Sequence, residues 1–262
     1  MQPAKGHRCP ACHSFLHPDP IKRKEAKLAE ILRGWIIHEL PNYQDLLPSD
    51  FTLDPAKLED LTFDELTQTI FEVMDAGQRS LPFGSPTYII PVFALGDDNS
   101  KKSEYIDHST EGTFTKDFRK SLGAAFAVKS LIARKFKGED AGIKLQIWDV
   151  ASGSSYRWFR PGFYRQASGA ILFFHHSLPQ TFESLDSWVD EICAVRPKTP
   201  LVIVGLLGGS NLASPKRLVS LSEIDKFRDR HQSPYYEVDL DQKAQFIRPW
   251  EKIAELMLVK HI

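Results

Sequence analysis

The sequence has few cysteines, no long apolar run and almost no net charge. Three cysteines among 262 residues cannot form a disulfide framework, which favours a reducing compartment. No apolar run approaches the roughly eighteen residues that span a membrane, and no secretory hydrophobic segment follows the first residues. A net charge of −1 argues against a general nucleic-acid-binding surface, which is normally basic. We therefore expect a cytoplasmic protein with no transmembrane segment that does not bind nucleic acid.

One segment has the pattern of a sheet that holds a metal ion next to a phosphate. The apolar residues Leu145, Ile147 and Trp148 lead into Asp149, and a second apolar run follows from Gly169 to Phe174. A buried strand can deliver a carboxylate to the loop at its C-terminal end, which is where α/β sheets bind ligands. The hydrophobic content of 42% is enough for a sizeable core around such a sheet.

These residues resemble the small GTPases of the Ras superfamily, and above all its Rab branch. In that family the third strand ends in WDTAGQE, and a YYRxAxGAI segment follows. Here Trp148-Asp149 resembles the first motif, and Phe163 to Ile171 matches the second nearly position for position. The resemblance covers about residues 87–260. It implies an α/β fold, namely a P-loop, three-layer domain with a mostly parallel six-strand sheet.

A candidate phosphate-binding loop lies about fifty residues before the carboxylate. The apolar segment Ile89 to Leu95 runs into Gly96, and Gly96, Lys102 and Ser103 are in register with the Walker A pattern G-x-x-x-x-G-K-[ST]. Lys101 takes the place of the second glycine. That glycine lets the backbone curl around the phosphates. A lysine there is costly if the position needs a positive φ.

The resemblance implies that Mg²⁺ binds at this loop with GTP or GDP. Phe118 to Gly123 resembles the YxSTIG segment of switch I, in which Ser121 stands where these GTPases carry a magnesium-binding threonine. Without its neighbouring motifs, Ser121 would be interpreted as an exposed loop serine. The implied nucleotide-binding residues are Gly96, Lys102, Ser103, Ser121 and Asp149, of which Ser103, Ser121 and Asp149 would bind Mg²⁺.

The departures from the family pattern fall on the residues that perform chemistry. Ser152 replaces the glycine whose N–H meets the γ-phosphate, and Gly153 replaces the glutamine that orients the attacking water. The guanine-reading NKxD motif should follow the strand from Leu201 to Gly205. The chain has Leu206-Leu207-Gly208-Gly209 there, without a carboxylate, and the final SAK motif reads Asp239-Leu240-Asp241. We therefore predict a retained sheet without guanine readout, and we assign no catalytic residue.

The resemblance leaves the first part of the chain to be explained separately. We divide the chain into residues 1–20, a zinc knuckle or a flexible tail, residues 21–86, a helical extension, and residues 87–262, the GTPase-like domain. The last residues contain no cysteine, so the prenylation that anchors most Rab and Ras proteins is not expected.

Two helices are predicted within the extension. Apolar residues at helical spacing from Leu28 to Leu40 predict the first, which Pro41 ends. Thr62 to Glu65 has the pattern of a capping box, and this predicts a second helix that continues through Met74.

A zinc site is one interpretation of the first residues. Cys9 and Cys12 have the C-x₂-C spacing of a zinc knuckle, but no second such pair completes it. His17 with either His13 or His7 can supply the remaining ligands. The alternatives are a tail without metal and a knuckle that another chain completes.

Two groups of residues later in the chain have simpler interpretations than catalysis. His175 and His176 follow the fourth strand, and adjacent residues on a strand point to opposite sides. We therefore expect one packed and one solvated histidine. The cluster around Trp158 and Phe159 is typical of core packing. In the family this surface also meets partners, so we expect a protein partner on the switch-like surface near these two residues.

We therefore expect a degenerate small GTPase with weak or absent guanine nucleotide binding, acting as an interaction module in signalling or membrane trafficking. The alternative is an active GTP-binding and GTP-hydrolysing small GTPase with divergent motifs, which the retained Lys102, Ser103 and Asp149 favour. A zinc-dependent nucleic-acid binder is a third hypothesis, which the net charge and the single knuckle disfavour.

Overall fold

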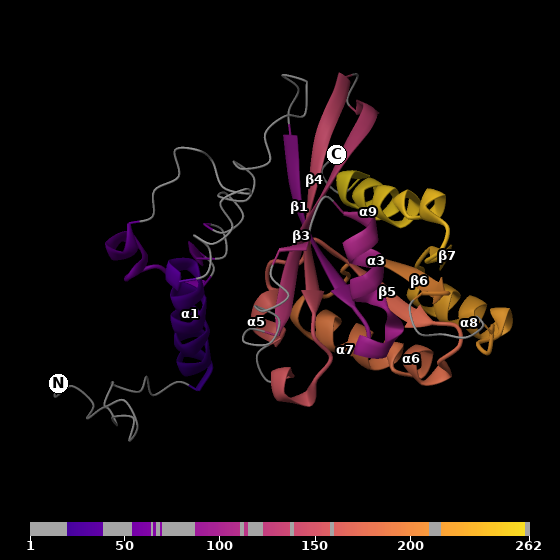
Figure 1. The fold of residues 1–262 in the computed structure, drawn as a ribbon, viewed down its shortest axis with the longest axis horizontal. Helices are drawn as coiled ribbons and strands as arrows, with labels where there is room; N and C mark the ends of the chain where they lie inside the picture. The colour runs from indigo at the N-terminus through magenta and orange to yellow at the C-terminus, as the bar shows by residue number, and fades with distance from the viewer. Residues whose placement is uncertain are drawn as a thin grey trace. The chain divides into compact units, whose positions relative to one another are not determined.

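A computed structural model describes residues 20–38, 54–63, 65–66, 69, 87–110, 113–114, 123–136, 139–157, 160–209 and 216–259. The chain divides into two compact units, Met1–Leu81 and Pro82–Ile262. The second unit contains the sheet and all the site residues discussed below (Figure 1).

The first unit contains the predicted first helix, α1 (Pro20–His38). Ala29, Leu32 and Ile36 recur at helical spacing and are buried, as the apolar pattern predicted. Arg33 donates hydrogen bonds from Nε to the carbonyl oxygen of Leu58 at 2.7 Å and from Nη2 to that of Leu61 at 3.1 Å. These bonds tie α1 to the turn of 3₁₀-helix at Pro55–Leu58 within the same unit.

The predicted capping box is also present in this unit. The Thr62 N–H donates to Glu65 Oε2 at 2.8 Å, and the Glu65 N–H donates to Thr62 Oγ1 at 3.3 Å. These hydrogen bonds satisfy two backbone donors at the start of a helix. The end predicted for that helix, near Met74, lies outside the described residues.

The second unit is built on one sheet with the strand order β2-β3-β4-β1-β5-β6-β7. The strands are β1 (Thr87–Leu95), β2 (Thr113–Phe114), β3 (Ala124–Phe136), β4 (Glu139–Val150), β5 (Gly169–His175), β6 (Leu201–Leu207) and β7 (Tyr235–Asp239). Strands β4, β1, β5, β6 and β7 are parallel, and β3 is antiparallel to β4. These six form the predicted mostly parallel sheet, and the two-residue β2 adds a short antiparallel edge to β3.

Helices cover both faces of the sheet, which gives the three layers that were predicted (Figure 1). They are α3 (Lys102–Ser109), α5 (Arg160–Tyr164), α6 (Pro179–Glu183), α7 (Leu185–Val195), α8 (Leu221–His231) and α9 (Ile247–Val259). On one face, Tyr105 of α3 packs against Phe173 of β5 and stacks on Trp250 of α9. On the other, Tyr164 of α5 packs edge-on against Phe93 of β1.

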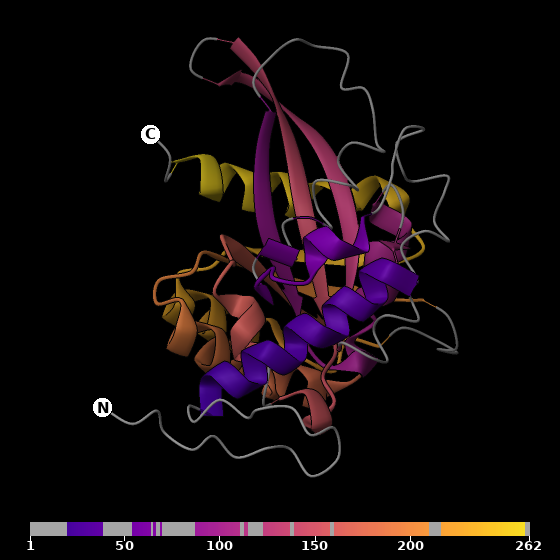
Figure 2. The same cartoon turned by 90° about the vertical axis from the view of Figure 1, so that its left-hand side faces the viewer.

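The β3–β4 hairpin is much longer than the strands on the other side of the sheet. Strand β3 has 13 residues and β4 has 12, whereas β7 has 5. The hairpin and β1 therefore run past the ends of the remaining strands (Figure 2). At their opposite, C-terminal ends, β1, β4 and β5 lie side by side, with Ala94 opposite both Asp149 and Ile171. This alignment brings the loops after β1 and β4 together.

Candidate functional site

The loop after β1 has the geometry of a phosphate-binding loop at its first residue. Gly96 has φ +139°, and a β-carbon added there would lie 2.3 Å from the carbonyl oxygen of Phe173 in β5. Any side chain would collide with that backbone, so glycine allows the loop to pass against the neighbouring strand. A turn of 3₁₀-helix, η4 (Asp98–Ser100), then leads to Lys101 and into α3.

Lys101 has a positive φ, the backbone conformation in which a lysine is costlier than a glycine. Its φ is +66° and its ψ is +15°, which is the left-handed region. The backbone thus curls as it would with glycine, and the lysine carries the conformational cost. Its Nζ lies 3.5 Å from Glu104 Oε2, so the side chain folds back along α3.

Three of the predicted site residues converge where β1 and β4 end. Lys102 is completely buried, and its Nζ lies 3.3 Å from Asp149 Oδ1 and 3.5 Å from Asp98 Oδ1. Ser103 Oγ donates a 2.6 Å hydrogen bond to Asp149 Oδ2. Asp149 itself is only 3% exposed. The family resemblance of the motifs implied that these three residues lie together.

The donor set fits phosphate and magnesium chemistry. The ammonium of Lys102 makes no hydrogen bond to any residue that the structure describes, although it is fully buried and ion-paired. A buried ammonium normally donates to several acceptors, and a phosphate would supply them. The hydroxyl of Ser103 and the carboxylate of Asp149 are oxygen ligands of the kind that Mg²⁺ prefers. We therefore find the residues present compatible with a magnesium-bound phosphate group.

Ser152 joins the loop after β4 to the phosphate-binding loop. The Asp98 N–H donates to Ser152 Oγ at 3.2 Å, and the Ser152 N–H donates to Asp98 Oδ1 at 3.3 Å. Asp98 and Ser152 are therefore paired in both directions across 54 positions of sequence.

Arg160 holds the same loop from another side, a role that was not predicted for it. It is buried, and its Nη1 donates to the carbonyl oxygens of Ala151 at 3.1 Å and Ser152 at 3.3 Å. Its Nη2 donates to Glu191 Oε2 at 2.8 Å, and its guanidinium lies 4.4 Å from the ring centroid of Trp188. The loop after β4 is thereby fixed to α7. A basic residue within the aromatic segment was the only signal in the sequence.

Glu191 is held in turn by a second buried partner. The Tyr164 hydroxyl donates to Glu191 Oε1 at 2.8 Å. Burial raises the pKa of Tyr164 well above its ordinary value, and the negative charge of Glu191 raises it further. The phenol therefore stays protonated in the alkaline range in which a free tyrosine would ionise, and it remains a hydrogen-bond donor there.

The loop after β6 has the shape of a close turn and leaves no room for side chains. Gly208 has φ +71° and Gly209 has φ +91°. A β-carbon on Gly209 would lie 2.7 Å from Leu240 Cδ1 and 3.1 Å from Glu104 Oε1. A β-carbon on Gly208 would lie 2.8 Å from Asp241 Oδ2. The nearby carboxylates thus come from α3, from the last residue of β7 and from the loop after it, and the predicted guanine-reading position supplies none.

The two adjacent histidines at the end of β5 are both buried, so the expectation that one would be solvated was wrong. His175 and His176 are each 0% exposed. They point to opposite sides, but each side of this parallel sheet is covered by protein. His175 Nε2 lies 3.1 Å from the carbonyl oxygen of Gly208, which links it to the glycine turn.

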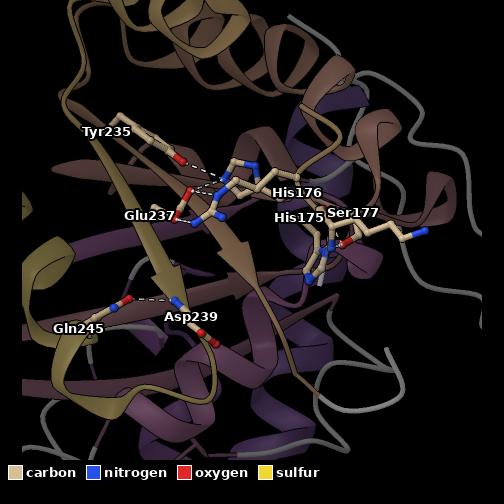
Figure 3. A network of polar contacts seen from close by, with 9 residues as sticks. His175, His176, Ser177, Tyr235, Glu237, Asp239 and Gln245 are labelled. Atoms are coloured by element: carbon tan, nitrogen blue, oxygen red, sulfur yellow. Dashed lines mark hydrogen bonds and ion pairs between the residues drawn. The ribbon is translucent and has the colours of Figure 1, made fainter. Parts of the chain in front are cut away.

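His176, which follows β5, belongs to a polar cluster with residues of β7 and of the segment before α8 (Figure 3). Its Nε2 lies 2.9 Å from the Tyr235 hydroxyl and 3.3 Å from Glu237 Oε2, and Arg217 pairs with the same glutamate. Burial lowers the pKa of His176 to about 4, in spite of the nearby carboxylate. The histidine is therefore neutral near pH 7, and the cluster is a packed edge of the sheet.

Several predicted residues lie outside the part of the chain that the structure describes. These are Cys9, Cys12, His13, His17, Ser121, Trp158 and Phe159. The zinc site, the switch I ligand and the partner surface near the two aromatic residues therefore stay predictions. Within the described ranges, no three histidine, cysteine or acidic residues are grouped as a metal site. None of the helices there is long and apolar enough to span a membrane.

Comparison with known proteins places this site in a family. Residues 92–258 match the Ras family. The Ypt/Rab-type GTPase ypt7 of Schizosaccharomyces pombe is 27% identical over 179 residues, which cover 67% of this chain and 85% of that protein. Ras-related protein Rab-7b of Mus musculus is 27% identical over 66% of this chain and 83% of its own length. Ras-related protein Rab-18 of Lymnaea stagnalis is 30% identical over 64% and 80%. The chain therefore belongs to the Ras family and is similar to its Rab-type members.

Proposed function

We propose that this chain is a degenerate small GTPase that binds guanine nucleotides weakly or not at all. We further propose that it acts as an interaction module in signalling or membrane trafficking. The observation that supports this is a contrast within one site. Lys102, Ser103 and Asp149 converge within hydrogen-bond or ion-pair distance, whereas Gly208 and Gly209 form the turn that should read the base.

Phosphate binding would rest on the converging residues. Lys102 and the backbone that follows Gly96 would bind the phosphates, as in a P-loop. Ser103 and Asp149, with Ser121, would hold Mg²⁺, which would neutralise part of the phosphate charge. Two features weaken this site. Lys101 carries the left-handed conformation, and the Asp98 carboxylate lies 3.5 Å from Lys102 Nζ.

Base selectivity and hydrolysis would both be poor. A guanine in this site would leave its N1–H and N2 donors without the usual carboxylate, at about 1–3 kcal/mol for each unpaired group. Glu104 is the carboxylate that approaches Gly209, and it lies 3.5 Å from the ammonium of Lys101. Gly153 has no side chain with which to orient a water molecule. Hydrolysis would then proceed without a side chain at this position to orient the attacking water, and it would be slow.

An interaction role is consistent with the firm attachment of α5, in the segment that resembles switch II, to α7. Arg160 and Tyr164 both bind Glu191 of α7, and Trp148 packs at 5.3 Å between ring centroids against Phe163. We propose that the partner binds near Trp158 and Phe159, which precede Arg160 in the sequence. Aromatic residues are enriched at protein interfaces, which supports that choice.

Nucleotide binding to the purified chain tests this proposal. The content of co-purified nucleotide is measured by chromatography after denaturation, and calorimetry then compares Mg·GTP with Mg·ATP. We expect similar and weak affinities for the two, and their loss in Lys102→Ala. The relative ypt7 is named a GTPase, so the alternative is an active enzyme. Tight GTP binding with rejection of ATP would establish that alternative, as would multiple-turnover hydrolysis that Asp149→Ala abolishes.

A further inference from the structure

The Asp98 carboxylate occupies a particular place between the two halves of the site. A single oxygen, Oδ1, lies 3.5 Å from Lys102 Nζ and 3.3 Å from the backbone nitrogen of Ser152. Lys102 is the first residue of α3, directly after the candidate phosphate-binding loop, and Ser152 is on the loop after β4. One negatively charged oxygen therefore bridges an ammonium at the start of α3 and an N–H donor on the loop after β4.

These two donors are the ones that a terminal phosphate would need. The lysine of a P-loop reaches the β- and γ-phosphates. Ser152 stands at the position whose N–H meets the γ-phosphate in the family that this chain belongs to. A carboxylate oxygen and a phosphate oxygen are both anionic acceptors, and each gains from donors that are charged or held by the backbone. Asp98 thus supplies, from within the chain, the anionic oxygen that a γ-phosphate would supply to Lys102 and to the Ser152 N–H.

We propose that the Asp98 carboxylate stands in for the terminal phosphate of a nucleoside triphosphate, so that the site takes nucleoside diphosphates in preference to triphosphates. The inference rests on the proposed function, because it concerns the same phosphate site. A diphosphate leaves the contacts of Asp98 with Lys102 and Ser152 in place. A triphosphate has to displace the carboxylate from both donors and then lie beside a like charge.

The size of this preference follows from the exposure of Asp98. Its side chain is 53% exposed, so the carboxylate can turn into solvent when a third phosphate enters. Solvent also screens the repulsion between the two anions. We therefore expect diphosphate to bind about tenfold more tightly than triphosphate, since like charges a few ångströms apart near a surface repel to that extent.

The contact between Asp98 and Ser152 also holds the loop after β4 in place when no ligand is bound. Asp98 holds the Ser152 N–H against the phosphate-binding loop, and Arg160 holds the carbonyl oxygens of Ala151 and Ser152 from the side of α7. The loop after β4 is therefore kept in the position in which its N–H faces the phosphate site. In this chain that position does not require a triphosphate.

The test measures Mg·GDP and Mg·GTP affinity by calorimetry for the full chain and for Asp98→Asn and Asp98→Gly. Asp98→Asn keeps the size of the side chain and removes the charge. The matched control is Asp97→Asn, because Asp97 Oδ1 accepts from Trp188 Nε1 at 3.1 Å instead. Thermal melting verifies that each variant folds. We expect a GDP preference of about tenfold in the parent chain and in Asp97→Asn, and a ratio near one in both Asp98 variants.

The outcomes separate this inference from the function on which it rests. Equal GDP and GTP affinity in the parent chain, or a ratio that the Asp98 variants leave unchanged, overturns the inference and leaves the proposed function standing. The same holds if neither nucleotide binds, even to Asp98→Gly. Tight GTP-selective binding with turnover overturns the proposed function. Hydrogen exchange adds a ligand-free readout: the Ser152 amide should exchange about tenfold faster in Asp98→Gly, and an unchanged rate argues against the bridge.

Discussion

Replacing Lys101 by glycine tests whether this residue limits the phosphate-binding loop. Lys101 has φ +66°, and the left-handed region costs a residue with a side chain roughly 1–2 kcal/mol. Glycine at the same place recovers that strain, but its unfolded state is more flexible, which offsets roughly 0.5–1 kcal/mol. The ion pair with Glu104, at 3.5 Å and partly exposed, is worth a few tenths of a kcal/mol. We expect Lys101→Gly to raise the free energy of unfolding by about 0.5 kcal/mol.

A matched variant separates backbone strain from site chemistry. Lys198 also has a positive φ, +63°, and it precedes β6, away from the phosphate-binding loop. In urea denaturation, Lys198→Gly should give a similar gain in the free energy of unfolding. In calorimetry with Mg·GDP, only Lys101→Gly should raise the affinity, by several-fold, because its loop can then adjust its N–H groups to the phosphates. Unchanged GDP affinity in Lys101→Gly would refute the idea that this lysine limits the loop.

Two other changes follow from the glycine turn and the buried histidine. Gly209→Asp should not restore guanine selectivity in competition binding, and it should lower the free energy of unfolding by roughly 2 kcal/mol. Its φ is +91° and its β-carbon would lie 2.7 Å from Leu240 Cδ1. Burial lowers the pKa of His176 from 6.5 to about 4, so the unfolded chain binds the extra proton between these values and stability falls as the pH falls. Urea denaturation should therefore give a free energy of unfolding about 2 kcal/mol lower at pH 5 than at pH 7 from this group, and His176→Gln should lose that part of the slope.

The convergence of Lys102, Ser103 and Asp149 could be predicted because it follows from strand order. Two apolar segments, each ending in a polar residue, predict two parallel strands, and the carboxyl ends of parallel strands meet at one edge of the sheet. The left-handed conformation at Lys101 followed from the same motif, since the loop needs it whatever the side chain. Local signals were also sufficient for α1 and for the capping box at Thr62, where the partners are a few residues apart.

The contacts that decide how the site behaves could not be predicted in the same way. Arg160 reaches Glu191 across 31 positions, and Asp98 reaches Ser152 across 54. No periodicity links residues at such distances, because tertiary packing alone brings them together. The expectation for His175 and His176 failed for a related reason. Alternation along a strand tells which residues share a side, but it does not tell whether that side is covered.

Under the proposed function, these contacts would let the GTPase fold keep a binding surface without nucleotide hydrolysis. In a working switch, a γ-phosphate attracts the N–H of the loop after β4, and hydrolysis releases it. Here Asp98 and Arg160 hold that loop from two sides with side chains that no reaction removes. Under the proposed function, the residue that would orient water, replaced by Gly153, would be dispensable, because the shape of the surface would not depend on cleavage. A partner would then recognise a fixed surface, and its affinity should be the same with GDP, with GTP and without nucleotide.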